Sequence, residues 1–284
     1  CNKQSSESTS EECSCDYYGS KRRKYVYGLK EIQAMSLLKG KVAIVTGSSK
    51  GIGKAIAKGL AEKGASVVIS SRNQEACDEV THELKNEGLS AIAIACHIGK
   101  EEQRKALVDD TIKQLGRIDI LVNNAGTIRR SPARDYSDED WGAVIDTNLT
   151  GVFQFCRAVG GKMIDQGHGK IINIASLLSF QGGITVPAYA ASKGGVSQLT
   201  KALANEWANL GVQVNAIAPG YIATDNTAAL RANPERNTAI LARIPAGRWG
   251  DASDIAGAAV FLASPASNYV NGHVLTVDGG WMAR

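Results

Sequence analysis

Three side chains near the middle of the sequence have the types and the spacing needed for acid–base chemistry on an oxygen atom: Ser176, Tyr189 and Lys193. Tyr189 and Lys193 are four positions apart, so in a helix they lie on one face. A free phenol titrates near about 10, which is too high for acid–base work at neutral pH. An ammonium group one helical turn away favours the phenolate and is expected to lower this pKa toward the operating pH. Ser176 can hydrogen-bond the reacting oxygen and hold it beside the phenol.

Together these residues predict that a proton moves to or from an oxygen while a hydride moves at the carbon that carries it. The alternative is a helix with an ordinary buried tyrosine and a solvated lysine, because this spacing also occurs by chance. The neighbouring elements favour the chemical interpretation. Residues 171–174 form a short β-branched run typical of a buried parallel strand. Ser176 follows the carboxyl end of that strand, where open α/β sheets place their chemistry, and Pro187 stands in the first turn of the helix with the Tyr/Lys pair.

A glycine-rich turn lies upstream, between a predicted strand (42–45) and a predicted helix (54–63). Gly47 permits the tight turn, Gly51 lets the backbone approach a pyrophosphate, and Gly53 lets the helix pack on the strand. The helix N-terminus offers free N–H groups and a favourable dipole to a phosphate. The strand, turn and helix together predict a dinucleotide site. Its further predicted members in this turn are Ser49, Lys50 and Ile52.

Arg72 follows the second predicted strand, 67–70, at the place where an NAD-binding chain would carry an acidic residue for the ribose 2′-hydroxyl. No acidic residue stands there. Arg72 and Lys50 can instead meet a 2′-phosphate. The expected cofactor is therefore NADP, with NAD as the alternative, and the simpler interpretation is that both cations only face solvent.

The ends of the later predicted strands supply further cofactor contacts. The third strand, 91–96, ends where the adenine usually lies, and the fourth, 118–122, ends in the small and carboxamide residues NNAG. The sixth strand, 212–217, breaks at a Pro-Gly pair. Such strand ends meet the cofactor at the carboxyl edge of a parallel sheet. The residues assigned to the cofactor here are His97, Ile98, Asn124, Ala125, Gly126, Pro219, Gly220, Ile222 and Thr224.

Two stretches are expected to complete the site. Residues 141–161 read as one long helix that contains Asn148, a mildly unfavourable residue in a helix interior, so its side chain must be bonded elsewhere or exposed. Such a helix beside the site can use Asn148 to hold a water near Lys193. Residues 221–250 are a long excursion late in the domain, predicted to be a lid over the substrate. Its arginines either bind a carboxylate or decorate an exposed helical pair; they are Arg231, Arg236, Arg243 and Arg248.

Strands that alternate with helices over residues 39–284 predict a single α/β domain with a Rossmann-type, doubly wound parallel sheet of seven strands. The seventh strand is predicted over 274–277, and the following Trp281 is expected to be exposed in a subunit contact. Residues 1–38 are polar, serine-rich and then basic, and they are predicted to be a disordered extension. The chain begins with Cys1, so this stretch is interpreted as a fragment, added sequence or targeting leader, with Met35 as a candidate natural start.

The composition argues against several classes of protein. The net charge of +4 is spread out apart from the basic run 21–24, so neither a nucleic-acid nor a membrane partner is predicted. No apolar run approaches the roughly 18 residues of a spanning helix. Cys13 and Cys15 have no second pair or histidine nearby, so no metal site is predicted. The isolated cysteines of the domain indicate reduced thiols and a cytoplasmic location. They are Cys77, Cys96 and Cys156.

From about residue 38 to the end, the chain resembles the short-chain dehydrogenase/reductase family. The resemblance rests on the glycine-rich turn, the NNAG string, Asn148, Ser176, the Tyr189/Lys193 pair and the Pro-Gly pair, in the family's order. It implies that Tyr189 is the acid/base and that Lys193 lowers its pKa and binds the nicotinamide ribose. It also implies that Ser176 orients the substrate, that Asn148 completes a proton relay, and that the protein is a homotetramer.

The second half is also similar to sugar-acid dehydrogenases within the family, through strings such as NNAGTIRR, INIASLLSFQGGITVPAY and RIPAGRWG. That similarity implies an NAD(P)-dependent interconversion of a ketone and a secondary alcohol on a sugar acid, with Arg129, Arg130 and Gln181 near the substrate. The alternatives within the same catalytic set are a 3-oxoacyl-carrier-protein reductase and a gluconate 5-dehydrogenase. A regulatory protein that binds NADP without chemistry is the alternative outside enzymes.

Overall fold

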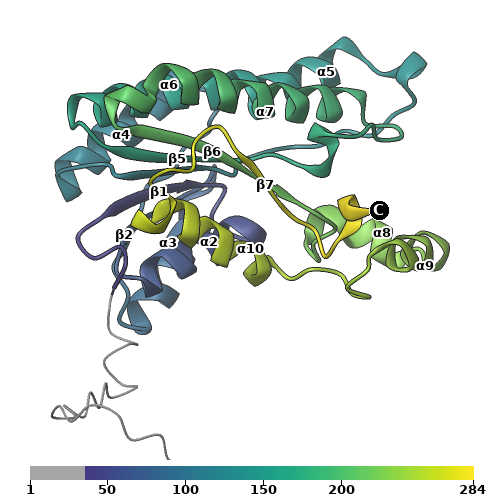
Figure 1. Cartoon of the computed structure of the whole chain (residues 1–284), viewed down its shortest axis with the longest axis horizontal. Coiled ribbons are helices and arrows are strands. Elements are labelled where there is room, and N and C mark those ends of the chain that lie inside the picture. Colours follow the sequence, from purple (N-terminus) through teal and green to yellow (C-terminus); the bar gives the residue numbers. More distant parts are fainter. Residues whose placement is uncertain (1–35) are drawn as a thin grey trace, which may run out of the picture. The chain divides into compact units, whose positions relative to one another are not determined.

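A parallel sheet of seven strands runs through residues 36–284, the part of the chain that the computed structural model describes (Figure 1). Its order is β3-β2-β1-β4-β5-β6-β7, with every neighbouring pair parallel. The strands are β1 (Val42–Thr46), β2 (Ser66–Ser70), β3 (Ala91–Ala93), β4 (Ile120–Asn123), β5 (Gly169–Ile174), β6 (Val212–Pro219) and β7 (Val274–Val277). The predicted doubly wound α/β fold is confirmed.

Helices cover both faces of the sheet (Figure 1). On one face lie α2 (Gly51–Glu62), α3 (Gln74–Asn86) and α10 (Ala252–Ala263); on the other lie α4 (Glu101–Leu115), α5 (Asp138–Ile145), α6 (Gly151–Asp165) and α7 (Pro187–Trp207). Two short helices, α8 (Ala228–Ala232) and α9 (Pro234–Arg243), lie beyond the carboxyl edge of the strands. Because both faces are covered, the central strands are buried at almost every position and read as continuous apolar runs.

The strand order reverses between β1 and β4, because the chain first winds outward to β3 and then returns to the other side of β1. Open α/β sheets bind ligands in the crevice at the carboxyl ends of the strands where the order reverses. The loops that follow β1, β4, β5 and β6 therefore define the region to inspect. Two separate apolar cores, one on each side of the sheet, hold these strands in place.

Several predicted boundaries differ from the structure. The third strand is shorter than predicted, since β3 ends at Ala93. The predicted helix over 141–161 is two α-helices, α5 and α6, joined by a π-helical segment, Asp146–Thr150. The predicted extension 1–38 lies outside the described residues as far as residue 35. Leu38, however, is 1% exposed and belongs to the core, so at this end the ordered domain begins before residue 39.

The excursion over 221–250 is closed at its base, where Ala223 N donates to Gly250 O at 2.7 Å and Gly250 N donates to Tyr221 O at 2.9 Å. Its helix α9 packs in a small apolar cluster that includes Ile240, Ile244 and Trp281. Trp281 is 5% exposed, so the expectation that it faces outward was wrong. The cluster forms because the chain after β7 turns back toward α9, which no local sequence pattern indicates.

Among residues 36–284, no helix combines the length and the apolar character needed to cross a membrane. The cysteines of the domain are free and buried, as expected for core thiols.

Candidate active site

A pocket of about 760 Å³ opens at the carboxyl edge of the sheet. Its walls come from the ends of β5 and β6, the start of α7, and α9. Many of the residues predicted for the site line it: Ile52, Asn124, Gly126, Arg130, Ser176, Gln181, Tyr189, Lys193, Pro219, Gly220, Ile222 and Thr224. Residues from distant parts of the sequence thus meet in one cavity, of a size typical of small-molecule sites.

Ser176, Tyr189 and Lys193 occupy one wall of this pocket. Ser176 follows β5 and caps a 3-10 turn, with its Oγ accepting from Leu178 N at 3.2 Å. Pro187 stands at the start of α7, where its missing N–H is not needed, and the helix then carries Tyr189 and Lys193 on one face. The Lys193 Nζ lies 5.7 Å from the centroid of the Tyr189 ring and donates to the Ile174 carbonyl at 2.5 Å.

The electrostatics of this wall correct one expectation. Burial raises the pKa of the Tyr189 phenol above its ordinary value, although a hydrogen bond with Ser176 and the charge of Arg130 act in the opposite direction. Burial also lowers the pKa of Lys193 to about 8. The phenol pKa is thus raised, whereas the sequence led us to expect a lowered value. Desolvation outweighs the nearby charge.

Asn148 lies in the π-helical segment and is fully buried. Its Oδ1 accepts from Thr127 N at 2.8 Å, while its Nδ2 donates to Thr127 O at 2.9 Å and to Ser192 Oγ at 3.2 Å. These bonds tie the loop after β4 to helix α7, one residue before Lys193. The predicted role of Asn148 in holding a water near Lys193 stays a prediction. Wide turns of this kind are frequent at functional sites.

The pocket lining also carries guanidinium groups. Arg130, Arg236 and Arg243 line the pocket, and none has a carboxylate within 4.0 Å among the described residues. The Arg243 guanidinium stacks 4.1 Å from the centroid of the Trp281 ring. The buried Nε1 of Trp281 has no hydrogen-bond partner within residues 36–284. Guanidinium groups beside a cavity without a carboxylate partner are suited to an anionic, oxygen-rich ligand.

The glycine-rich turn has the shape that a pyrophosphate requires. Gly47 and Gly51 have φ values of +64° and +55°, which favour glycine. A Cβ at Gly53 would collide with the Gly47 carbonyl and the Asn124 side chain, whereas beyond Gly51 there is only Thr224, at 3.6 Å. No side chain caps the N-terminus of α2, so its first N–H groups remain available. These features fit the phosphates of a dinucleotide.

Comparison with known proteins agrees with this geometry. A profile of the family described as Enoyl-(Acyl carrier protein) reductase matches residues 47–282. A 2-dehydro-3-deoxy-D-gluconate 5-dehydrogenase from Pseudoalteromonas atlantica is 54% identical over 248 residues, which cover 87% of this chain and 98% of that protein. The chain belongs to the short-chain dehydrogenase/reductase family.

Two solved structures of the family extend the comparison. A putative 2-deoxy-D-gluconate 3-dehydrogenase from Agrobacterium tumefaciens with bound NADP is 51% identical, with a TM-score of 0.82, over 88% of this chain and 100% of that one. A gluconate 5-dehydrogenase from Burkholderia cenocepacia in complex with NADP and tartrate is 43% identical, with a TM-score of 0.86, over 89% of this chain and 99% of that one.

Other predicted cofactor residues of this short-chain dehydrogenase/reductase lie outside the pocket lining. Lys50 and Arg72 are exposed, and Lys50 Nζ pairs with Asp225 Oδ2 at 2.6 Å. Because both partners of that pair face solvent, it is weak and readily exchanged. His97 points back to its own loop, where its Nδ1 accepts from Gly99 N at 3.1 Å, and Ile98 is buried. The remaining ones lie close in sequence to the ends of β1 and β4. Gly47 and Ser49 stand in the loop after β1, Gly51 and Gly53 in the first turn of α2, and Ala125 in the loop after β4.

A polar network below the site escaped the sequence analysis. Asn123 Nδ2 donates to Asn173 Oδ1 at 2.9 Å, and Asn173 Nδ2 donates to Thr200 Oγ1 at 3.0 Å. These bonds join β4, β5 and α7 directly beneath Ser176 and Lys193. The available signal was an asparagine inside the otherwise apolar run of β5, since asparagine is depleted in strands and a buried amide needs partners.

Proposed function

We propose that this chain interconverts a ketone and a secondary alcohol on a sugar acid, with NADP as the preferred cofactor and NAD as the alternative. The observation that carries the proposal is the pocket itself. Tyr189, Ser176 and the buried Lys193 line it together with arginines that have no carboxylate partner among residues 36–284. The curated relative with 54% identity is named for a sugar acid, which supports the same substrate class.

The dinucleotide supplies or accepts a hydride when it is bound. The open turn at Gly51, with the free N–H groups of α2 behind it, suits the pyrophosphate. Exposed Lys50 and Arg72 suit a ribose 2′-phosphate, because no carboxylate stands after β2 to meet a 2′-hydroxyl. The NADP bound to the structural relatives from Agrobacterium tumefaciens and Burkholderia cenocepacia supports this choice.

Tyr189 is assigned as the acid/base. In reduction its phenol gives a proton to the ketone oxygen as the carbonyl carbon receives the hydride; in oxidation the phenolate takes that proton back. Because burial raises the phenol pKa, the protonated donor is the ready form at neutral pH, and oxidation is expected to need more alkaline conditions. Ser176 is assigned to hold the substrate oxygen, and Lys193 to supply positive charge and hydroxyl-binding donors beside the phenol.

The substrate carboxylate is assigned to the arginines that line the pocket. Arg130 already acts on the electrostatics of Tyr189, so it stands near the reacting oxygen. Arg243 is held flat against Trp281, which leaves the edge of its guanidinium group for a carboxylate. The side-chain amide of Gln181, on the loop after β5, can accept hydrogen bonds from sugar hydroxyls and donate hydrogen bonds to them. Asn148 is assigned a positioning role, because its bonds fix the loop after β4 against α7.

A homotetramer in the cytoplasm completes the proposal. The family resemblance supports the assembly. Exposed apolar side chains on α5 (Trp141, 43%) and α6 (Phe153, 40%) are available for contacts between subunits. The free thiols of the domain support the reducing compartment.

Initial rates provide the test. The purified protein is assayed with NADPH and with NADH on the 5-ketone of 2-dehydro-3-deoxy-D-gluconate, beside an acetoacetyl thioester. We expect turnover on the sugar acid, with NADPH preferred. Replacing both Lys50 and Arg72 by glutamine should remove that preference without abolishing NADH turnover. Turnover on the thioester alone would contradict the proposed substrate and indicate an acyl chain instead. Equal rates with NADPH and NADH would show that Lys50 and Arg72 do not select the cofactor.

A further inference from the structure

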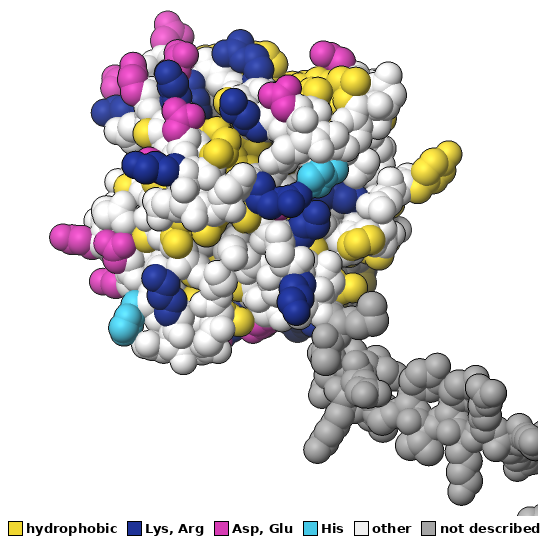
Figure 2. Space-filling model, turned by 90° about the vertical axis from the view of Figure 1, so that its left-hand side faces the viewer, with side chains coloured by type: hydrophobic (Ala, Val, Ile, Leu, Met, Phe, Trp, Pro, Cys, Tyr) yellow, Lys and Arg dark blue, Asp and Glu magenta, His cyan; other side chains and the backbone are white. Residues whose placement is uncertain are grey.

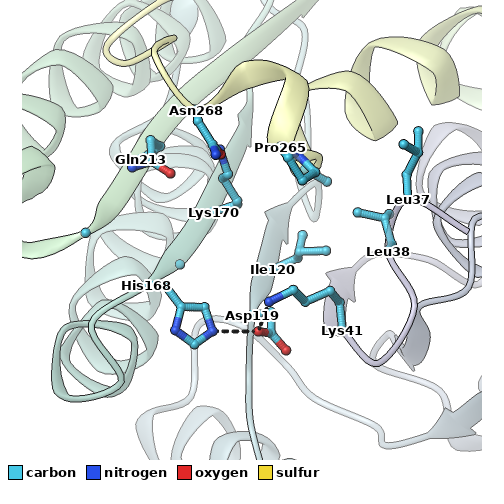
Figure 3. A pocket seen from close by; sticks show the side chains of 13 residues that line it. Leu37, Leu38, Lys41, Asp119, Ile120, His168, Lys170, Gln213, Pro265 and Asn268 are labelled. Atoms are coloured by element: carbon cyan, nitrogen blue, oxygen red, sulfur yellow. Dashed lines mark hydrogen bonds and ion pairs between the residues drawn. The ribbon is translucent and has the colours of Figure 1, made fainter.

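A second pocket, of about 410 Å³, lies at the amino edge of the sheet, opposite the candidate active site. It forms where four strands begin: Lys41 precedes β1, Ile120 opens β4, and Lys170 and Gln213 stand second in β5 and β6. The side chains drawn in Figure 3 surround this hollow. Its volume lies within the range of small-molecule sites. No step of the proposed reaction uses it.

The polar wall of this pocket is built around one buried carboxylate. Asp119 is 2% exposed in its side chain and contacts Lys41 Nζ at 3.1 Å, Arg117 Nη2 at 2.7 Å and His168 Nε2 at 2.8 Å. Figure 3 shows the bonds from Lys41 and His168. Two permanent cations thus share one anion, so this wall carries an excess of positive charge even with a neutral imidazole.

Lys170 adds a further cation on the facing wall, where its side chain lies beside Asn268 (Figure 3). Its Nζ donates to Asn268 Oδ1 at 2.9 Å and to Ser267 Oγ at 3.3 Å, both neutral oxygens. No carboxylate stands within 4.0 Å of this ammonium among residues 36–284. Burial lowers its pKa to about 8, which means that its charge is poorly compensated. An anion in the pocket would compensate it.

The remaining lining is apolar. Leu37 lines the pocket and is 48% exposed. Further apolar side chains line the same hollow: Leu38, Ile120, Ala263 and Pro265. On the face of the molecule shown in Figure 2, basic side chains gather with a histidine near the middle, and the acidic ones lie mainly toward the margins. The pocket therefore combines an apolar floor with a cationic rim.

We propose that this pocket binds an amphipathic monocarboxylate, a small organic anion with a short unbranched apolar chain. The carboxylate pairs with Lys170 and Lys41, and the chain covers Leu37 and Ile120. An inorganic anion would leave the apolar floor in water, and a neutral alcohol would leave the cations uncompensated. An acidic peptide would bring polar backbone against a wall that has few free hydrogen-bonding groups.

Isothermal titration of the full chain with octanoate tests the proposal, with NADP present at saturation. We expect one site whose affinity rises roughly fourfold for each methylene from butanoate to octanoate, and falls as sodium chloride is added because the rim is partly exposed. Octan-1-ol and inorganic phosphate should each bind at least about tenfold more weakly than octanoate. If octan-1-ol bound as tightly as octanoate, the cations would have no role in binding. If phosphate bound as tightly as octanoate, the alkyl chain of the ligand would have none. Either result would overturn the proposal.

Variants locate the site. Lys170→Gln should lower the affinity for octanoate roughly tenfold or more, because it removes a charge-assisted hydrogen bond. Lys105→Gln, on the exposed side of α4, should leave that affinity unchanged. Leu37→Ser should flatten the dependence on chain length. Turnover should be unaltered in each, which shows that the variants fold. If Arg243→Gln abolishes octanoate binding and Lys170→Gln does not, the ligand sits in the active-site pocket and the proposal is wrong. A change of oligomeric state in Lys170→Gln, without loss of a ligand, would identify a subunit contact and also overturn it.

Discussion

The two edges of the sheet use polar groups in opposite ways. At the carboxyl edge, three arginines line the pocket without a carboxylate partner within residues 36–284. At the amino edge, both oxygens of the buried Asp119 accept hydrogen bonds from several donors. Groups left unpaired beside a cavity are available to a ligand, while a satisfied buried cluster holds the fold together. The difference distinguishes the site of the proposed reaction from the Asp119 cluster, which anchors strand starts at the other edge.

The winding of the chain explains this contrast. Chain reversals into the amino edge are tight: Gly116, Gly167 and Gly211 have φ values of +80°, +71° and +84°, and Gly169 N donates to Gly211 O at 3.1 Å. The carboxyl edge is followed by longer loops, which include the whole 221–250 excursion. Loops on a rigid scaffold are where binding and catalytic residues concentrate.

Tyr189→Phe gives the largest expected effect and tests the carboxyl edge. Removing the hydroxyl removes the acid/base, so kcat should fall about a thousandfold or more, while the affinity for NADPH and the free energy of unfolding change little. Steady-state rates, fluorescence titration of NADPH and urea unfolding measure the three quantities. Tyr269→Phe, at a fully exposed tyrosine, is the matched control. Turnover retained within a few fold in Tyr189→Phe would remove the acid/base assignment.

Asp119→Asn makes the opposite prediction for the amino edge. Loss of the buried charge leaves Lys41, Arg117 and His168 facing one another, so the free energy of unfolding should fall by about 3 to 4 kcal/mol. At 25 °C kcat should stay within about twofold, because the strand ends that carry chemistry are at the other edge. Urea unfolding beside steady-state assays measures both, with Asp110→Asn on the exposed side of α4 as control. A loss of kcat without a loss of stability would break the division between the two edges.

The local sequence was sufficient for the fold and for most of the carboxyl edge. The turn after β1 and the Tyr189/Lys193 pair are each contained in one short stretch, where spacing and periodicity fix which residues meet. Burial of Trp281 could not be predicted in this way, because it depends on α9, about 40 residues earlier in the chain. The pKa of Tyr189 had the same limitation: spacing shows which charge is near, but the extent of desolvation depends on the packing of the whole pocket.

The amino-edge pocket left no sequence signal. Each of its residues is a single position at a strand start or a turn, drawn from places as distant as Leu37 and Asn268. No motif, repeat or helical period links them, and only the parallel order of β1, β4, β5 and β6 brings them together. Asn148 is an intermediate case. Its position was predicted from the sequence, but the π-helical turn that directs its side chain to Thr127 and Ser192 was not.

Lys193 and Lys170 allow a direct comparison of the two edges, since burial lowers the pKa of each to about 8. Unfolded lysine titrates near about 10.4, so between these values the unfolded state binds more protons and stability rises with pH. Below pH 8 both states are protonated and the penalty of burial is constant. In the native protein Lys193 contributes a rise in the free energy of unfolding of at most about 3 kcal/mol between pH 7 and pH 10. Lys193→Met should remove that rise, which urea unfolding measures. Lys170→Met should remove less, because that ammonium is near solvent and screened. Equal slopes for both variants would show that the two ammonium groups are equally desolvated.

Arg243→Gln gives the smallest expected effect. It tests whether an arginine of the active-site pocket recognises the negative charge of the substrate. If a substrate carboxylate pairs with this guanidinium, its loss should raise KM for the sugar acid about tenfold and leave kcat nearly unchanged, because the group lies away from the reacting oxygen. A neutral ketone substrate should show no change in KM, and Arg243→Lys should recover part of the affinity through charge alone. Arg157→Gln, which removes an exposed cation on α6 stacked on Phe153, is the control outside the pocket. An equal rise in KM for charged and neutral substrates would mean that Arg243 acts by supporting Trp281, and the carboxylate would then have to be assigned to Arg130 or Arg236.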